Sequence, residues 1–339
     1  MKILLLQLKR IGDLILTTPA IAALREKFPE ADISLVVSSA TRDLLPAIRG
    51  LDHTFVARGR IRDAADWFTV ARRRYDYCLD FTHNDRSAFL TVLSGAPTRI
   101  TSDHAALQSK FRALSYNVLV KSSLRFLHTV DHHLAMLEPL EIHDAAQEVQ
   151  LDLPGSAVAE ADRILAQSGI KGDYLVVHPG SARIEKFWEA KRWSEVIAFA
   201  GRAGLACLIT GGRSALEQEH IGQIKAASGR DSFVDLSGRL NLLTLAALIK
   251  KARLLATVDS APMHLGAAMQ TPQVVLFGPT NPLHWRPRFT PAVILQAGET
   301  APLTEFSPDQ KRVPMSLIST EQVIDAMNSL LAAPRGASV

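Results

Sequence analysis

The chain has 339 residues, with 38 Lys or Arg, 34 Asp or Glu, and 47% hydrophobic residues. This length exceeds one ordinary hydrophobic core and suits two domains. The composition is that of a globular protein and excludes an intrinsically disordered chain. No stretch holds the roughly 18 apolar residues that a membrane span needs, and Lys9, Arg10 and Asp13 interrupt the first apolar run too early for a signal peptide. We therefore expect a cytoplasmic protein.

Positive charge is concentrated between Arg58 and Arg125, which contains 12 Lys or Arg and 6 acidic residues. This predicts an anionic partner, which could be a nucleic acid, an anionic membrane surface or a phosphorylated ligand; a solvated basic face is the alternative. Aromatic residues are only 6% of the chain and no nucleic-acid motif is present, so no nucleic-acid partner is expected. Cys78 and Cys207 lie in apolar runs and are predicted to be buried free thiols.

The first half of the chain alternates short apolar runs with segments of helical spacing. Strands are predicted at 2–8, 31–38, 52–57, 75–82 and 98–102, and helices at 19–29, 63–75, 86–96 and within 123–142, the last of them ending near Pro139. The stretches 151–156 and 169–173 have the composition of linkers.

The alternation begins again at Tyr174. Strands are predicted in 174–181, 205–212, 233–238, 254–260 and 273–280, with helices at 190–204, 214–228, 242–252, 262–270 and 319–333. Strand-then-helix repetition is typical of parallel sheets covered on both faces. Two doubly wound units are therefore expected, with ligands bound beyond the carboxyl ends of the strands.

Five strand ends of the second unit carry small residues where the chain turns: 178–181, 210–212, 236–238, 259–264 and 277–280. Small residues let a ligand approach the backbone, and the helix that follows offers free N–H groups to an anion. Neither a GxGxxG nor a GxxxxGK[ST] motif is present. The pattern predicts a nucleotide site of another kind, although tight turns also require glycine for steric reasons.

The stretch "DSAPMH" (259–264) carries the most specific prediction. A pyrophosphate at this turn would meet backbone N–H groups, the positive end of a helix and His264. The alternative makes Asp259 a helix N-cap and leaves His264 on a polar surface.

Three further residues have both a functional and an ordinary interpretation. Lys186 could reach the same phosphates, or it is a surface lysine. Glu217 could accept a hydrogen bond from a ribose hydroxyl, or it is a first-turn helix acid. Asp13, in "LKRIGDLILTTPAI", could act as a base, or it is an acid favoured by the helix dipole.

Together, "RIGDLILTTPAI", "HPGS…K.W…KRW", "LSG" and "DSAPMHLGAA…TP…LFGPT" resemble the lipopolysaccharide heptosyltransferases of glycosyltransferase family 9. The resemblance extends in order over nearly the whole chain. "LKRIGDLILTTP", "DSAP" and "HWRP" (284–287) are most similar to the heptosyltransferase III branch.

The resemblance implies an α/β protein of the GT-B fold, with two Rossmann-like doubly wound domains facing across a cleft. The expected parts are an acceptor-binding domain at 1–153, a nucleotide-sugar-binding domain at 154–318, and a helix at 319–333 that crosses back to the first domain. The implied reaction is an inverting, metal-independent transfer of heptose from ADP-L-glycero-D-manno-heptose to the inner core of lipopolysaccharide. No cofactor is expected. A monomer is expected, with peripheral contact at the cytoplasmic face of the inner membrane.

Residue by residue, the resemblance makes Asp13 the catalytic base. The donor would be bound by a larger set, in which Glu217 is preferred to Glu219: Gly12, Ser181, Lys186, Glu217, Leu240, Asp259, Ser260, Ala261 and His264. Nearby cations are expected to bind acceptor phosphates: Arg10, Arg58, Arg60 and Arg62. The chain departs from the family at Ala261, where many members have glycine, and a methyl group there could alter which sugar is accepted.

Two rival functions remain open at this point. The first is a GT-B glycosyltransferase that uses another nucleotide sugar or a non-lipopolysaccharide acceptor. The second is a two-domain binding protein that closes on a ligand without chemistry, which would be expected to carry a secretion signal and gives no reason for Asp13.

Overall fold

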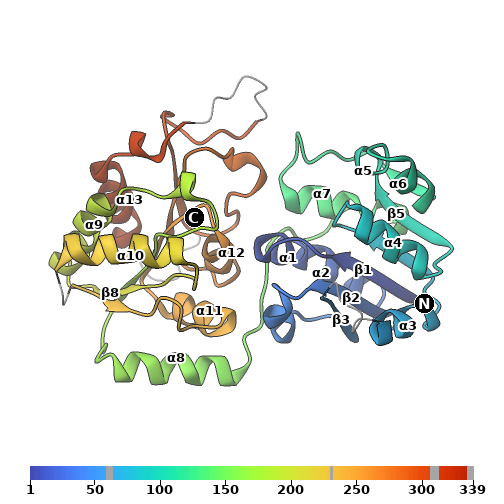
Figure 1. The fold of residues 1–339 in the computed structure, drawn as a ribbon, viewed down its shortest axis with the longest axis horizontal. Coiled ribbons are helices and arrows are strands. Elements are labelled where there is room, and N and C mark those ends of the chain that lie inside the picture. Colours follow the sequence, from blue (N-terminus) through green and yellow to red (C-terminus); the bar gives the residue numbers. More distant parts are fainter. Residues whose placement is uncertain (59–63, 230–231, 306–312, 334–339) are drawn as a thin grey trace. The chain divides into compact units, whose positions relative to one another are not determined.

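The computed structural model describes residues 1–58, 64–229, 232–305 and 313–333. The chain divides into two compact units, Met1–Asp152 and Leu153–Val339 (Figure 1). The division falls inside the predicted linker at 151–156. Each unit contains one parallel sheet with helices packed against it, and each is described by itself below.

The first unit contains a six-stranded parallel sheet with the strand order β3-β2-β1-β4-β5-β6. Its strands are β1 (Lys2–Gln7), β2 (Asp32–Ser38), β3 (His53–Ala57), β4 (Tyr77–Asp80), β5 (Thr98–Ser102) and β6 (Val118–Val120). The first five were predicted. The sixth was missed because it is an edge strand of only three residues.

Seven helices are described in the first unit. They are α1 (Ile11–Ile15), α2 (Thr18–Lys27), α3 (Ala64–Arg72), α4 (Asp85–Leu93), α5 (Asp103–Ala106), α6 (Lys110–Ser115) and α7 (Thr129–Ala135). The helix predicted within 123–142, with its end near Pro139, is shorter than expected: α7 ends at Ala135, and Glu138–Leu140 forms a separate 3-10 turn containing Pro139. Proline fits the first positions of such a turn and would break a continuous helix.

The second unit repeats this sheet, with the strand order β12-β11-β10-β7-β8-β9. Its strands are β7 (Tyr174–His178), β8 (Ala206–Ile209), β9 (Val234–Asp235), β10 (Leu254–Val258), β11 (Gln273–Phe277) and β12 (Ala292–Gln296). Counted from its own first strand, each sheet has the order 3-2-1-4-5-6 of a Rossmann fold. The strand order therefore reverses between β1 and β4 in one unit and between β7 and β10 in the other.

Helices cover the second sheet on both faces: α8 (Gly155–Gln167), α9 (Ala190–Arg202), α10 (Ala215–Ser228), α11 (Leu242–Lys251), α12 (Ala261–Ala268) and α13 (Thr320–Ala332). Because successive strand residues face opposite sides, Val274 and Leu276 join the large core shared with α9, whereas Val275 and Phe277 pack with Met263 of α12. Both faces of this sheet are buried, which explains the continuous apolar runs in its sequence.

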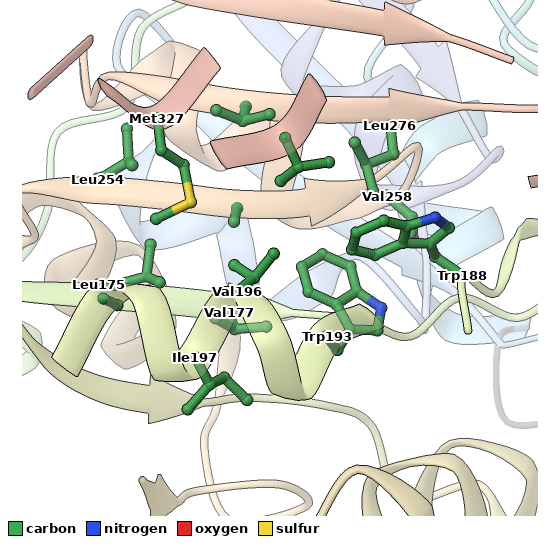
Figure 2. Packing of buried hydrophobic residues seen from close by; sticks show 14 of the residues in the cluster. Leu175, Val177, Trp188, Trp193, Val196, Ile197, Leu254, Val258, Leu276 and Met327 are labelled. Carbon is green, nitrogen blue, oxygen red and sulfur yellow. The ribbon is translucent and has the colours of Figure 1, made fainter. Parts of the chain in front are cut away.

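The large core of the second unit is built around two tryptophans (Figure 2). Trp188 and Trp193 are fully buried, and their rings meet edge to face with centroids 5.1 Å apart. The indole N–H of Trp188 donates to the carbonyl of Ile318 at 2.9 Å, which satisfies its polar atom inside the core.

The last helix, α13, packs into this same core. Val323, Met327 and Leu330 are buried in it, and Ser319 caps the helix by accepting from the Gln322 N–H. The apolar face of this helix is therefore used in the second unit, and the predicted crossing back to the first domain stays a prediction. None of the helices in the described ranges is long and apolar enough to cross a membrane.

Candidate active site

The clearest candidate site lies at the carboxyl ends of β7 and β10, where the strand order of the second sheet reverses. In open α/β sheets this switch point is where ligands bind. The turn after β7 leads through Ser181 to Lys186, and the turn after β10 holds Asp259 and Ser260. The predicted residues of these two turns are therefore brought to neighbouring strand ends.

Lys186 and Asp259 form a buried ion pair at this switch point. The Lys186 Nζ lies 2.5 Å from Oδ2 of Asp259 and 3.2 Å from its carbonyl oxygen, and both residues are less than a tenth exposed. The hydroxyl of Thr280, from the turn after β11, also donates to Oδ2, at 2.6 Å. An ammonium has three donors, and Asp259 takes two of those of Lys186, so one is left without a partner among the described residues.

This geometry excludes two of the ordinary interpretations. Lys186 is not a surface lysine. Asp259 is not a helix cap, because Ser260 occupies the N-cap position of α12. The Ser260 hydroxyl donates to the Val258 carbonyl at 3.2 Å, so it does not cap the helix either. The cap residue of α12 thus supplies no side-chain acceptor to the N–H groups at the amino end of the helix. Such N–H groups can donate to an anionic ligand.

His264 and Ala261 lie in the first turn of α12. His264 is only 6% exposed, so its placement on a polar surface is excluded. Ala261 is half-buried and is the first residue of the helix.

Glu217 lies at the next turn, after β8. Its Oε1 accepts from the Gly212 N–H at 3.1 Å, and its Oε2 accepts from the Ser214 hydroxyl at 3.0 Å. A Cβ at Gly180 would lie 2.5 Å from Oε1 of Glu217. Glycine at this position therefore lets the backbone of the turn after β7 lie close to the carboxylate. Glu219, the weaker candidate, is exposed. Glu217 is therefore a first-turn acid that holds the turn between β8 and α10, and a ribose contact stays a prediction.

His178, at the end of β7, was not among the predicted residues. Burial lowers its pKa to about 4, while Glu217, with Oε1 3.9 Å from Nε2, acts in the opposite direction. Its Nδ1 pairs with the Thr210 hydroxyl at 2.9 Å. The stretch "HPGS" could have indicated this residue, because its histidine is the last residue of a strand before a turn of the predicted site.

Two other predicted donor contacts lie at neighbouring turns. Ser181 is buried, and its Oγ accepts from the Arg183 N–H at 3.4 Å. Leu240 is half-buried between β9 and α11. Both positions follow strand ends of the sheet, and their contacts with a donor stay predictions.

Asp13 lies at the corresponding switch point of the first sheet, in the short helix α1 that follows β1. Its Oδ2 accepts from the backbone N–H of Arg10 at 3.3 Å, and its side chain is partly exposed. Gly12 lies within α1 and does not have a positive φ. Its contact with a donor stays a prediction. A carboxylate in the first turn of a helix is favoured by the positive end of the helix dipole. A role for Asp13 as a base stays a prediction.

The predicted acceptor cations are only partly described. Arg10 is exposed beside Asp13. Arg58 follows β3, two strands from β1, and its Nη1 lies 3.7 Å from Oδ2 of Asp66. Arg60 and Arg62 lie outside the described residues.

Sequence reasoning missed a polar network at the end of β4, across the switch point from Asp13. The buried Asp80 carboxylate accepts four hydrogen bonds, from the Ser87 and Tyr116 hydroxyls and from the N–H groups of Thr82 and His83. Burial raises the pKa of Asp80, and these hydrogen bonds oppose the shift. They hold His83 in a left-handed conformation, with φ of 62°.

His83 meets His132 and His133 of α7 in one cluster. The His83 and His132 rings stand edge to face with centroids 5.1 Å apart. Burial lowers the pKa of His132 to about 3 and those of the other two well below their usual value. The Nε2 atoms of all three have no hydrogen-bond partner within the described residues. The cluster consists of neutral imidazoles, and no group of metal-ligating side chains is found in the described ranges.

The sequence profile of glycosyltransferase family 9 (heptosyltransferase) matches residues 67–312, which is more than half of the chain. The chain belongs to this family. It is therefore a glycosyltransferase, and the predicted GT-B class of two Rossmann-like units is confirmed.

Relatives within the family extend over nearly the whole chain. Lipopolysaccharide heptosyltransferase 3 of Escherichia coli is 29% identical and covers 94% of this chain and 96% of its own length. A solved glycosyltransferase family 9 protein from Veillonella parvula covers 97% of both chains with 25% identity and a TM-score of 0.83. The heptosyltransferase WaaC of E. coli, solved with ADP, has the same coverage, 19% identity and a TM-score of 0.71, and it supports the fold alone.

Proposed function

We propose that the protein transfers heptose from ADP-L-glycero-D-manno-heptose to the inner core of lipopolysaccharide, with inversion at the anomeric carbon. An acceptor hydroxyl attacks C1 of the heptose as the bond between C1 and the phosphate oxygen breaks. The hydroxyl proton passes to Asp13, and ADP leaves with the electron pair of the broken bond. A positioned carboxylate of this kind typically accelerates such a step by roughly 10²–10⁴-fold.

The Lys186–Asp259 pair is the observation that carries the proposal. It places a buried ammonium with one unused donor beside the amino end of α12, which lacks a side-chain cap. Departing ADP gains negative charge, and preorganised positive groups in a buried site stabilise it strongly. We propose that this charge stabilisation lets the transfer proceed without a metal ion. His264, Ser260 and Ala261 would line the same pyrophosphate.

The remaining donor contacts follow the neighbouring strand ends. Glu217 would accept from a ribose hydroxyl through the lone pairs that Gly212 and Ser214 leave unused, and Leu240 would pack against the adenine. Ser181 and Gly12 complete the proposed donor set. In this assignment residues 154–318 bind the donor and residues 1–153 bind the acceptor.

The acceptor side of the proposal is centred on Asp13. The exposed Arg10 stands next to it, and Arg58 lies at the same edge of the first sheet. With Arg60 and Arg62, these cations would bind the phosphates of the lipopolysaccharide core. We propose a monomer that works at the cytoplasmic face of the inner membrane. Similarity to heptosyltransferase 3 of E. coli supports this acceptor class.

A second candidate function is transfer from another nucleotide sugar or to another acceptor. It is favoured by Ala261, whose methyl group stands at the first position of α12, close to Ser260 and Asp259. A methyl group in place of glycine takes space beside the donor sugar.

Turnover of ADP-heptose with a set of core-truncated lipopolysaccharides tests the proposal. We expect ADP release and heptose incorporation with one truncated acceptor, in the presence of a metal chelator. Parallel assays with UDP-glucose and ADP-glucose separate the two candidates. Turnover confined to one of those sugars would reject the heptose donor while leaving the glycosyltransferase assignment in place.

A further inference from the structure

Exposed apolar side chains gather in one part of the first unit. Of the twelve most exposed large hydrophobic residues in the described ranges, seven lie between Phe89 and Phe126. They are Phe89, Val92, Leu107, Phe111, Leu114, Leu119 and Phe126. Leu107 is 79% exposed and Leu114 is 82% exposed. Scattered single residues of this kind are ordinary, whereas a gathering marks an interaction surface.

The same segment carries the positive charge of the chain. Residues 86–126 contain six Lys or Arg and a single acidic residue, Asp103. The rest of the chain contains 32 basic and 33 acidic residues. The formal excess of +4 therefore comes entirely from the segment that also exposes the apolar side chains.

Three helices hold this surface together. Helices α4 and α6 pack against each other, and α5 packs against α6; all three group beside β5 in Figure 1. The Arg112 guanidinium of α6 donates to Asp85 of α4 at 2.6 Å. Beneath them Ala88, Ala106 and Tyr116 form a small buried cluster. We call this surface the α4–α6 face and define it by Phe89, Val92, Leu107, Phe111 and Leu114 with Lys110.

We propose that the α4–α6 face docks the protein on an anionic lipid bilayer. The apolar side chains would enter the boundary between headgroups and acyl chains, while Lys110 and Lys121, the residue that follows β6, would meet lipid phosphates. Apolar insertion combined with basic residues is the chemistry that holds a protein on an anionic membrane without a spanning helix.

Charge decides between a bilayer and a second copy of the chain as the occupant. Two copies meeting through this face would bring two strongly positive segments together, and like charges at an interface oppose association. An anionic bilayer supplies both the apolar layer and the opposite charge.

This inference deepens the proposed function, because a lipid-linked acceptor would be met at the membrane surface. Its test is independent of that function, since vesicle binding needs neither a donor nor an acceptor. The full chain would be sedimented with vesicles of phosphatidylglycerol and phosphatidylcholine, and with phosphatidylcholine vesicles alone.

We expect binding to the anionic vesicles that weakens as salt is raised. Lys110→Gln with Lys121→Gln should weaken it roughly 25-fold, at about fivefold for each cation. Leu107→Ser with Leu114→Ser should weaken vesicle binding by roughly tenfold or more, because the two apolar side chains that would be buried in the bilayer are lost. The exposed residues of the second unit supply matched controls: Arg202→Gln with Lys225→Gln, and Leu317→Ser.

Replacing the exposed Leu114 with tryptophan reports insertion directly. In Leu114→Trp, fluorescence should shift to shorter wavelength when anionic vesicles are added. Binding that is equal for face and control variants would overturn the proposal. So would a dimer in light scattering that Leu107→Ser with Leu114→Ser disperses, since a second copy would then be the occupant. If vesicle binding holds while heptose turnover is absent, the docking face stands and the proposed function fails.

Discussion

Replacing Lys186 with methionine tests the buried pair at the candidate donor site. The two side chains are only 11% and 8% exposed, so little solvent screens them. Met keeps the length of the apolar stem and removes the charge. Asp259 would then keep the Thr280 hydroxyl as its remaining side-chain donor. Leaving one member of a buried pair unpaired costs about 3–5 kcal/mol.

The expected shift of the urea midpoint follows from this loss of folding free energy. A domain of this size unfolds with a slope of about 2–3 kcal/mol per molar urea, so a cost of about 3–5 kcal/mol should lower the urea midpoint by about 1–2.5 M. Three of the four tryptophans, Trp188, Trp193 and Trp285, lie in the second unit, so their fluorescence follows its unfolding. The double variant Lys186→Met with Asp259→Asn removes both charges and should recover much of the loss.

Calorimetry with ADP separates binding from stability. Both the single and the double variant should bind ADP at least tenfold more weakly, because a charged hydrogen bond to phosphate contributes about 1.5–3 kcal/mol. An unchanged midpoint in Lys186→Met would refute the buried charge pair. Unchanged ADP affinity in the double variant would refute the phosphate contact.

Two further predictions concern stability. His132 has a folded-state pKa of about 3 against about 6.5 when unfolded, so the unfolded chain binds the extra proton and the folded first unit loses stability as pH falls from about 6.5 toward 3. Between pH 7 and pH 5 the loss of stability due to His132 amounts to about 2 kcal/mol. Denaturation followed by circular dichroism should show that His132→Gln removes this contribution. Equal pH dependence in the two proteins would contradict a buried neutral imidazole. Gly212→Ala would displace the Glu217 carboxylate from the hydrogen bonds that it accepts from Gly212 and Ser214 and should cost about 1–3 kcal/mol. Gly222→Ala, in open space on α10, should be stabilising by up to about 1 kcal/mol. Similar thermal shifts for the two glycine variants would remove the steric argument.

The sheets could be predicted well from the sequence because their central strands are buried on both faces. Such strands appear as continuous apolar runs bounded by turns. In each sheet, one edge strand was not predicted from the sequence. β6 has only three residues, and β12 follows the proline-rich stretch 282–291. Edge strands owe their position to pairing with a neighbour, which local sequence does not record.

The donor-side residues were predictable for a topological reason. Parallel strands place their carboxyl ends at one edge, so Lys186, Asp259 and Glu217 follow strand ends that lie near one another. The partner of Lys186 was not predictable, since 73 residues separate it from Asp259. The unit whose core takes up α13 was not predictable, because an amphipathic pattern shows that one face of a helix is buried but not in which unit.

The histidine cluster shows the same limit. His83 follows β4, whereas His132 and His133 stand on α7, and only folding brings them together. A histidine on its own gives little indication of burial. Asp80 offered the better signal, as an acid at the end of an apolar strand, like Asp259 in the second unit.

Turnover by Asp13→Asn tests the central claim most directly. Asparagine preserves the shape of the side chain and cannot take the acceptor proton. With ADP-heptose and the acceptor that the wild-type protein uses, we expect the turnover rate to fall by roughly 10²–10⁴-fold, while calorimetry gives an ADP-heptose affinity within about twofold of the wild type. Asp43→Asn, an exposed acid of the same unit, should turn over normally. Wild-type turnover by Asp13→Asn would contradict the account, because heptose transfer would then have another base.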